Sequence, residues 1–176
     1  MKKRILTWLL AISMLGSLLT VPAGAAAVTK FSDVSDSYTA TAVETLRLMG
    51  VLDGYGDGTF RPDTILNRAQ FCKMAVYAMD GSEELGRYST VTIFPDVKPS
   101  HWASAYINMA AKKGIISGFA DGKFKPGQTV TAGQAVTILM RGLGYKDEDM
   151  GGVWPQSYMA EAQTNGLLKS TGITSA

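Results

Sequence analysis

Two glycine- and aspartate-rich loops carry residue types that can bind ions or phosphate. The first reads GYGDGTFRP (residues 54–62), and the second, GFADGKFKP (118–126), repeats it sixty-four residues later. Aspartates in such a loop can hold calcium, successive backbone amides can hold phosphate, and an Asp-Gly pair can form a tight turn. The function of the chain depends on which of these three roles the loops perform.

The loop sequences fit a tight turn better than a calcium or a phosphate site. An EF-hand-like loop counted from Asp53 places Tyr55 and Thr64 at positions where oxygen ligands of calcium are needed, and a serine replaces Asp53 in the second copy. The Lys-Ser/Thr ending of a P-loop and the GxGxxG spacing of a dinucleotide site are both missing from the loops. The Asp-Gly pairs at 57–58 and 121–122 are strong turn dipeptides. We therefore expect architectural turns, with no metal and no cofactor.

Few residues offer nucleophilic or acid–base catalysis. Cys72, the only cysteine, lies at helical apolar spacing in RAQFCKMAVYAM, which favours a buried thiol, and His101 is the only histidine. A glycan hydrolase needs two catalytic carboxylates on facing walls. Most acidic residues instead belong to the turns, to cap positions such as Asp33 and Asp96, or to the exposed-looking runs GSEELGR and KDEDMGG. We expect no enzyme activity.

The loops are part of a longer internal repeat. FSDV at 31–34 returns as FPDV at 94–97, and the segments around the two loops align, like the loops themselves, at an offset of 64 residues. This defines one unit over 31–80 and a second over 94–145. A third, partial unit covers 146–176, where WPQSYMAEAQTNGLL matches WASAYINMAAKKGII of the second. Repeats of this size bury their apolar faces against their neighbours, so we expect a core shared between units.

Each unit reads as helix, turn, helix, which predicts a mostly α fold. Apolar residues recur at helical spacing, and Gly50 and Gly114 follow the first helices, where glycine tolerates the left-handed conformation. The second helices open with Asn67-x-x-Gln70 and Thr131-x-x-Gln134, which are typical of capping boxes.

The N-terminus has the three-part layout of a secretory signal peptide. Three basic residues precede an apolar run, and small residues then offer cleavage after Ala25 or Ala27, which predicts a signal over residues 1–25. The apolar run is shorter than the ~20 residues of a membrane span, and we expect no membrane span once the signal is removed. The remaining chain has 14 basic and 15 acidic residues. This balance lacks the basic footprint of a nucleic-acid-binding protein.

The ordered motifs F-x-D-V, G-[YF]-x-D-G-x-F-[RK]-P and [TN]-R-A-Q resemble those of the S-layer homology family. The resemblance covers the chain from Phe31 onward. It implies a pseudo-threefold helical bundle of three repeats, here with the third repeat incomplete. It also implies non-covalent anchoring to the bacterial cell wall or S-layer. The implied partner is a secondary cell-wall polymer or peptidoglycan-linked glycan, often an acidic sugar that carries a pyruvate ketal.

The resemblance implies an arginine that grips the acidic group of the polymer. That arginine is Arg68, beside Asn67 in the motif ILNRAQ, whereas TVTAGQ in the second unit keeps only Thr131. Guanidinium binds carboxylate through paired, charge-assisted hydrogen bonds. A solvated arginine at a helix start is the alternative interpretation.

Further polymer contacts are predicted at other repeat positions. Tyr38, Trp102 and Trp154 share one position and either stack on sugar rings or pack in the core. Asp33 and Asp96 serve first as caps and second as sugar contacts.

Two functions besides anchoring remain open at the level of sequence. The chain is either an assembly protein, whose incomplete third unit is covered by a protein partner or by self-association, or the N-terminal fragment of a longer surface enzyme.

Overall fold

The computed structural model describes residues 30–79, 82–169 and 171–174, and the predicted signal peptide (1–25) lies outside them. The elements in order are α2 (Ser37–Leu48), α3 (Arg68–Ala78), the 3-10 helix η1 (Ser82–Tyr88), α4 (Ser104–Lys112), α5 (Ala132–Gly142), the 3-10 helix η2 (Asp147–Asp149) and α6 (Gln156–Thr164). The described residues contain no strand longer than an isolated bridge between Asn67 and Thr129. The mostly α fold of tandem helix–turn–helix repeats is confirmed, whereas the threefold arrangement stays a prediction.

Helices α2, α4 and α6 end in the same way, although they belong to three successive units. Each is followed by a glycine with positive φ, at Gly50, Gly114 and Gly166. The next amide donates to the carbonyl five residues back, in the pairs Val51–Leu46, Ile115–Ala110 and Leu167–Ala162. This is the Schellman ending, and the left-handed conformation that it needs explains the three glycines. None of these helices is long and apolar enough to cross a membrane, nor is any other in the described part of the chain.

The starts of the second helices, α3 and α5, differ from each other. Asn67 and Gln70 form a complete capping box at α3, as predicted. At α5 the Thr131 hydroxyl accepts from the amide of Gln134, but the side chain of Gln134 does not reach back. It accepts a hydrogen bond from Arg68 instead. The predicted second box is therefore wrong in its returning half, because a buried guanidinium needs that acceptor.

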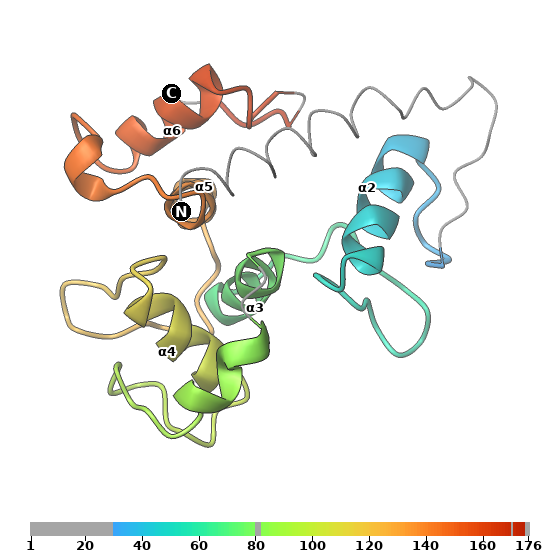
Figure 1. The fold of residues 1–176 in the computed structure, drawn as a ribbon. Helices are drawn as coiled ribbons and strands as arrows, with labels where there is room; N and C mark the ends of the chain where they lie inside the picture. Colours follow the sequence, from blue (N-terminus) through green and yellow to red (C-terminus); the bar gives the residue numbers. More distant parts are fainter. Residues whose placement is uncertain (1–29, 80–81, 170, 175–176) are drawn as a thin grey trace.

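Apart from the contact of α4 with η1 in the linker, the main helix contacts run between units. Helix α3 of the first unit packs on α4 of the second, α5 of the second packs on α6 of the third, and α3 meets α5 (Figure 1). The α3–α4 pair holds the largest apolar cluster, around Val76, Ile107 and Phe124, and the α5–α6 pair a smaller one around Met140 and Tyr158. A core shared between units is thus observed, and it joins the second helix of one unit to the first helix of the next.

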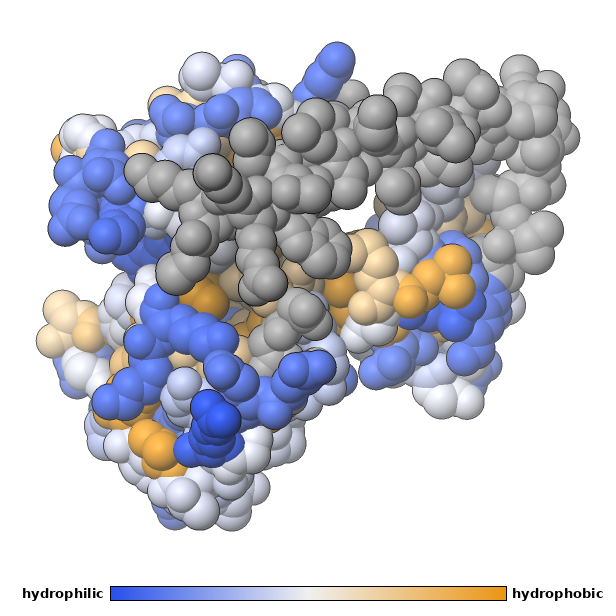
Figure 2. Space-filling model, viewed as in Figure 1, coloured by the Kyte–Doolittle hydropathy of each residue, from blue (hydrophilic) through white to orange (hydrophobic). Residues whose placement is uncertain are grey.

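Helix α2 lies apart from the other helices (Figure 1). Its buried residues form a separate small cluster with Phe31, Val34 and Leu52. Leu48 and Met49 at its end remain 72% and 59% exposed. Figure 2 shows hydrophobic side chains at the surface on the side of the molecule where α2 lies. The first unit therefore leaves apolar surface that no described residue covers.

Both glycine- and aspartate-rich loops are tight turns, as the sequence predicts. The amide of Gly58 donates to the Tyr55 carbonyl (3.1 Å), and that of Gly122 to the Phe119 carbonyl (2.9 Å). A glycine at the entrance of each loop is required for packing, because a Cβ at Gly118 would lie 2.6 Å from the Phe94 ring. The loops repeat because the fold repeats.

Candidate functional site

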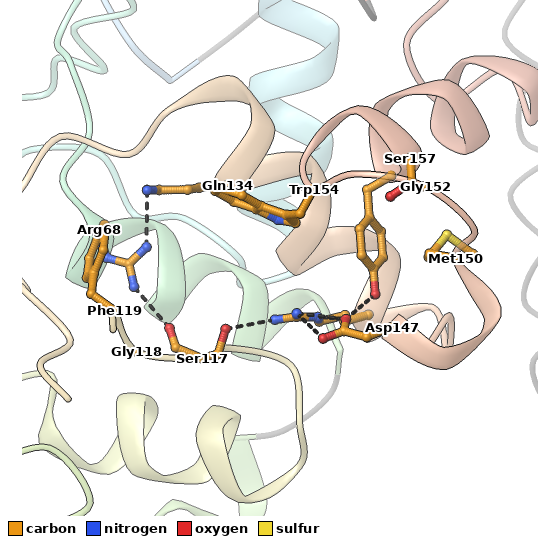
Figure 3. A pocket seen from close by; sticks show the side chains of 12 residues that line it. Arg68, Ser117, Gly118, Phe119, Gln134, Asp147, Met150, Gly152, Trp154 and Ser157 are labelled. Atoms are coloured by element: carbon orange, nitrogen blue, oxygen red, sulfur yellow. Dashed lines mark hydrogen bonds and ion pairs between the residues drawn. The ribbon is translucent and has the colours of Figure 1, made fainter. Parts of the chain in front are cut away.

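A pocket of about 420 Å³ opens where the second loop meets α5 and the segment that leads into α6 (Figure 3). We call it the inter-repeat pocket, because its walls come from three units. Its lining residues are Arg68, Ser117, Gly118, Phe119, Gln134, Arg141, Asp147, Met150, Gly152, Trp154, Ser157 and Tyr158. Of the predicted site residues, Arg68 lines it, and so does Trp154 from the aromatic repeat position.

Arg68 begins α3 yet is only 4% exposed. Its Nε donates to the Phe124 carbonyl (2.8 Å), Nη1 to Gln134 Oε1 (3.1 Å) and Nη2 to the Ser117 carbonyl (3.3 Å). The guanidinium carbon also lies 4.7 Å and 4.5 Å from the ring centroids of Phe119 and Phe124. A solvated arginine, the alternative considered from sequence, is not what the structure shows.

The backbone at the start of α3 holds this arginine against the second loop. The Arg68 amide donates to the Gln128 carbonyl (2.8 Å) and the Ala69 amide to the Pro126 carbonyl (3.0 Å). The Val130 amide donates back to the Leu66 carbonyl (3.1 Å). The free amides of a helix start are thus satisfied by chain from the next unit, which fixes the position of Arg68.

The charge of Arg68 has no ion-pair partner among the described residues. Its three acceptors are two carbonyls and an amide oxygen, and burial lowers the pKa of the guanidinium from its usual value. The carboxylate of Asp96 receives the amides of Phe124 and Lys125. A guanidinium has five N–H groups, so two remain after these three bonds. A buried cation without a counter-charge at the wall of a pocket favours an anionic ligand.

A second guanidinium, that of Arg141, lies on the other side of Ser117 and is already neutralised. Its Nη1 donates to Ser117 Oγ (3.2 Å), and its Nε and Nη2 donate to the Asp147 carboxylate at 2.7–2.9 Å. The Tyr158 hydroxyl donates to the same carboxylate (2.5 Å). This hydrogen bond and the arginine lower the pKa of Asp147. The two cations of the pocket therefore differ, one paired and one not.

Trp154 gives the pocket an oriented aromatic wall. Its indole Nε1 donates to Thr137 Oγ1 on α5 (3.0 Å), while 52% of the residue stays exposed. The Thr137 hydroxyl donates in turn to the Gly133 carbonyl (2.7 Å). An aromatic ring fixed at one edge and open to solvent can receive the apolar face of a sugar.

The remaining predicted site residues lie outside this pocket. Asn67 and Thr131 cap α3 and α5. Asp33 accepts from the amides of Phe60 and Arg61 (2.8 and 2.7 Å), as Asp96 does in the second unit. These aspartates tie the start of each unit to its loop, and their contact with a polymer stays a prediction.

Tyr38 and Trp102 are surface residues, 69% and 56% exposed, rather than core residues. The Trp102 ring stacks on His101 with 5.7 Å between ring centroids. Core packing, the alternative weighed from sequence, is thus not observed at either position, and sugar stacking there stays a prediction.

The lining residues that sequence reasoning missed include Arg141, Asp147 and Tyr158. Asp147 lies in the run KDEDMGG, which the sequence predicts to be exposed, and its side chain is 69% exposed although it lines the pocket. The available signal was a departure from the repeat, since Arg141 occupies the position that Tyr77 holds in the first unit.

The described residues show no metal-binding group and an unreactive thiol. No cluster of three or more His, Cys, Asp or Glu side chains that could hold a metal occurs among them. Cys72 is fully buried, and burial raises the pKa of its thiol to about 12. Since the thiolate is the nucleophile, this cysteine is unsuited to covalent catalysis.

Comparison with known proteins identifies the repeats. The family model described as "S-layer homology domain" matches residues 30–72 and 93–136. A "Cell surface protein" of Thermoanaerobacter kivui is 39% identical over 148 residues, covering 82% of this chain and 19% of that protein. A "Surface layer protein" of Brevibacillus choshinensis is 32% identical over 163 residues, covering 89% and 14%. A "Cellulosome-anchoring protein" of Acetivibrio thermocellus is 32% identical over 120 residues, covering 64% and 26%. The chain thus spans only a small part of the length of these relatives.

Proposed function

Because residues 30–72 and 93–136 belong to the S-layer homology family, we propose that this chain is a non-catalytic anchoring module of the cell wall or S-layer. Its ligand is a secondary cell-wall polysaccharide that carries an acidic group, such as a pyruvate ketal. The relatives named for the cell surface, the surface layer and cellulosome anchoring support this role.

The observation that carries the proposal is the buried, uncompensated charge of Arg68. Burying a cation without a counter-ion costs free energy, and an anion that enters the pocket recovers part of it. The three protein acceptors leave one N–H group on Nη1 and one on Nη2. A guanidinium can donate two N–H groups to the two oxygens of one carboxylate. The acidic group of the polymer therefore binds at Arg68.

The rest of the pocket suits a sugar ring. The Trp154 indole is held by Thr137, and Ser117 and Ser157 lie among the short polar side chains of the lining. An aromatic wall together with a small number of fixed polar groups is typical of sites that recognise one orientation of a small ligand. The sugar that carries the acidic group stacks on Trp154.

Co-sedimentation with purified Gram-positive sacculi tests the proposal. The chain without its predicted signal peptide, called here the secreted chain (residues 26–176), is mixed with three preparations. These are intact sacculi, sacculi stripped of their secondary polymer, and sacculi from which pyruvate has been removed. Arg68→Gln is compared with Arg61→Gln, because Arg61 also lies over an aromatic ring, that of Tyr55 (4.0 Å), but pairs with Asp57 on the surface. Circular dichroism verifies that both variants fold.

We expect the chain to pellet with intact sacculi alone, and Arg68→Gln to lose this binding while Arg61→Gln keeps it. Pelleting with stripped sacculi would refute the polymer as ligand. Equal binding by the two variants would refute Arg68 as the anion site.

Protein assembly is a second candidate, favoured by the apolar surface at α2. Leu48, Met49 and Ile65 are 72%, 59% and 74% exposed. Surfaces of this kind mark interaction sites when they are contiguous. Sedimentation equilibrium of the secreted chain distinguishes the candidates, since assembly predicts a concentration-dependent mass that Leu48→Asp reduces to that of a monomer.

A further inference from the structure

The inter-repeat pocket contains its own carboxylate. Asp147 begins the short helix η2 and reaches back to Arg141, whose side chain is only 12% exposed, while that of Asp147 is 69% exposed. All three donor contacts to Asp147 from Arg141, and the one from Tyr158, lie within 2.5–2.9 Å. Asp147 therefore covers the Arg141 guanidinium from the solvent side.

The two guanidiniums share one neighbour. Arg68 donates to the Ser117 carbonyl and Arg141 donates to the Ser117 hydroxyl, so both cations contact the same residue of the pocket wall. Without Asp147 the pocket would present two free cationic groups to a ligand. With Asp147 it presents one.

We propose that Asp147 determines the charge selectivity of the pocket by occupying Arg141, so that the pocket accepts a ligand unit with one negative charge and rejects a dianionic unit. The inference rests on the proposed function, because it concerns the same pocket. A second anionic group of a ligand that bound near Ser117 would lie close to the Asp147 carboxylate, and the two negative charges would repel each other. A phosphomonoester, which carries between one and two charges at neutral pH, is disfavoured relative to a carboxylate.

The test measures binding of two small probes by calorimetry at pH 7.5: methyl glucuronide, a monoanion, and glucose 6-phosphate, a dianion. Asp147→Asn removes the charge and keeps an oxygen that accepts hydrogen bonds. Asp149→Asn is the matched control, since it removes the same formal charge from the same helix η2. Tyr158→Phe removes only the hydroxyl that holds Asp147.

We expect the wild type to bind methyl glucuronide more tightly than glucose 6-phosphate. Asp147→Asn should increase the affinity for glucose 6-phosphate about fivefold, a gain of the size that a solvent-exposed charge pair gives, and change that for methyl glucuronide less than about twofold. Tyr158→Phe should give a smaller gain in the same direction, and Asp149→Asn none.

Two results would overturn the inference. If Asp147→Asn weakens both probes alike, Asp147 only holds the pocket wall in place. If Asp149→Asn gives the same gain as Asp147→Asn, the effect is that of net charge. Failure of the proposed function is distinguishable, because the wild type would then bind neither probe nor intact sacculi.

Discussion

The helix pairs α5–α6 and α3–α4 place different side chains at equivalent positions. In α5–α6, Arg141 and Tyr158 meet through the Asp147 carboxylate. In α3–α4 the corresponding residues are Tyr77 and Tyr106, whose hydroxyls lie 3.2 Å apart and whose ring centroids lie 5.7 Å apart.

The loops beside the two helix pairs also differ in the charged side chains that they contact. The second loop receives the buried guanidinium of Arg68 through the carbonyls of Ser117 and Phe124. Beside the first loop, Lys73 forms a long ion pair with the exposed Asp53 (3.6 Å) and lies 5.5 Å from the ring centroid of Tyr77. One repeated scaffold thus carries a charged pocket at one pair and a tyrosine contact at the other. The chemistry lies where the sequence departs from its own repeat.

The largest difference should appear in the free energy of unfolding when Arg68 of α3 and Arg61 of the first loop are each replaced. Arg68→Ala leaves the buried acceptors of Phe124 and Gln134 without their donor and should cost about 3 kcal/mol of unfolding free energy. Arg61→Ala breaks a surface pair with Asp57 and should change stability little. Urea denaturation of both variants measures this. Equal losses would show that the burial of Arg68 has no energetic consequence.

The next difference concerns binding through the two tryptophans. Trp154 and Trp102 are similarly exposed, but only Trp154 lies in a pocket with an uncompensated cation. Trp154→Ala should weaken binding to the wall polymer about tenfold, the equivalent of ~1.4 kcal/mol, and Trp102→Ala less than about twofold. Titration of sacculi with each variant measures both effects. A larger loss with Trp102→Ala would move the site to the α3–α4 pair.

Much of the local structure could be predicted from the sequence. The helices, their glycine endings and the Asn67 box depend on residues within one turn of each other, so spacing alone reveals them. The identity of Arg68 as an anion-binding candidate could also be predicted, from the motif that contains it.

The burial of Arg68 could not be predicted, because it depends on contacts across units. Its acceptors at Ser117, Phe124 and Gln134 lie 49, 56 and 66 residues away. An alignment of the units assigns each motif to its own unit, whereas in the structure α3 packs against the loop of the next unit. This contact between units is also the reason that the Gln134 side chain bonds to Arg68 and not to the start of its own helix. No local pattern records which unit a helix packs against.

The contact between Tyr77 and Tyr106 should contribute less to the free energy of unfolding than Arg68 does, and its contribution should be lost at alkaline pH. Burial and the hydrogen bond with Tyr77 raise the pKa of Tyr106 from 10.0 to about 12. Since the folded pKa is raised, this stabilisation is present below pH 10 and is lost as the pH rises toward 12. Tyr106→Phe should cost about 1 kcal/mol at pH 8. Thermal unfolding of both proteins should show the difference disappearing between pH 10 and 12, and a constant difference would contradict the assignment.

Asp147 should make the smallest contribution to the free energy of unfolding, and this contribution should be lost in acid, whereas that of Tyr106 is lost in alkali. The hydrogen bond from Tyr158 and the ion pair with Arg141 lower the pKa of Asp147 below 3.8. A lowered folded pKa stabilises the protein above the unfolded value, so this contribution is lost as the pH falls below about 4. Because the carboxylate is mostly exposed, Asp147→Asn should cost less than ~1 kcal/mol at pH 7.

Urea denaturation of the wild type and Asp147→Asn at pH 7 and pH 2.5 measures this contribution, with Asp149→Asn as the control of equal charge. The difference between wild type and Asp147→Asn should become smaller from pH 7 to pH 2.5, while that between wild type and Tyr106→Phe persists there. If neither difference became smaller in acid, Asp147 would act through packing rather than charge. The α5–α6 pair would then be no more ionic than the α3–α4 pair, and the contrast between the two would rest on Arg68 alone.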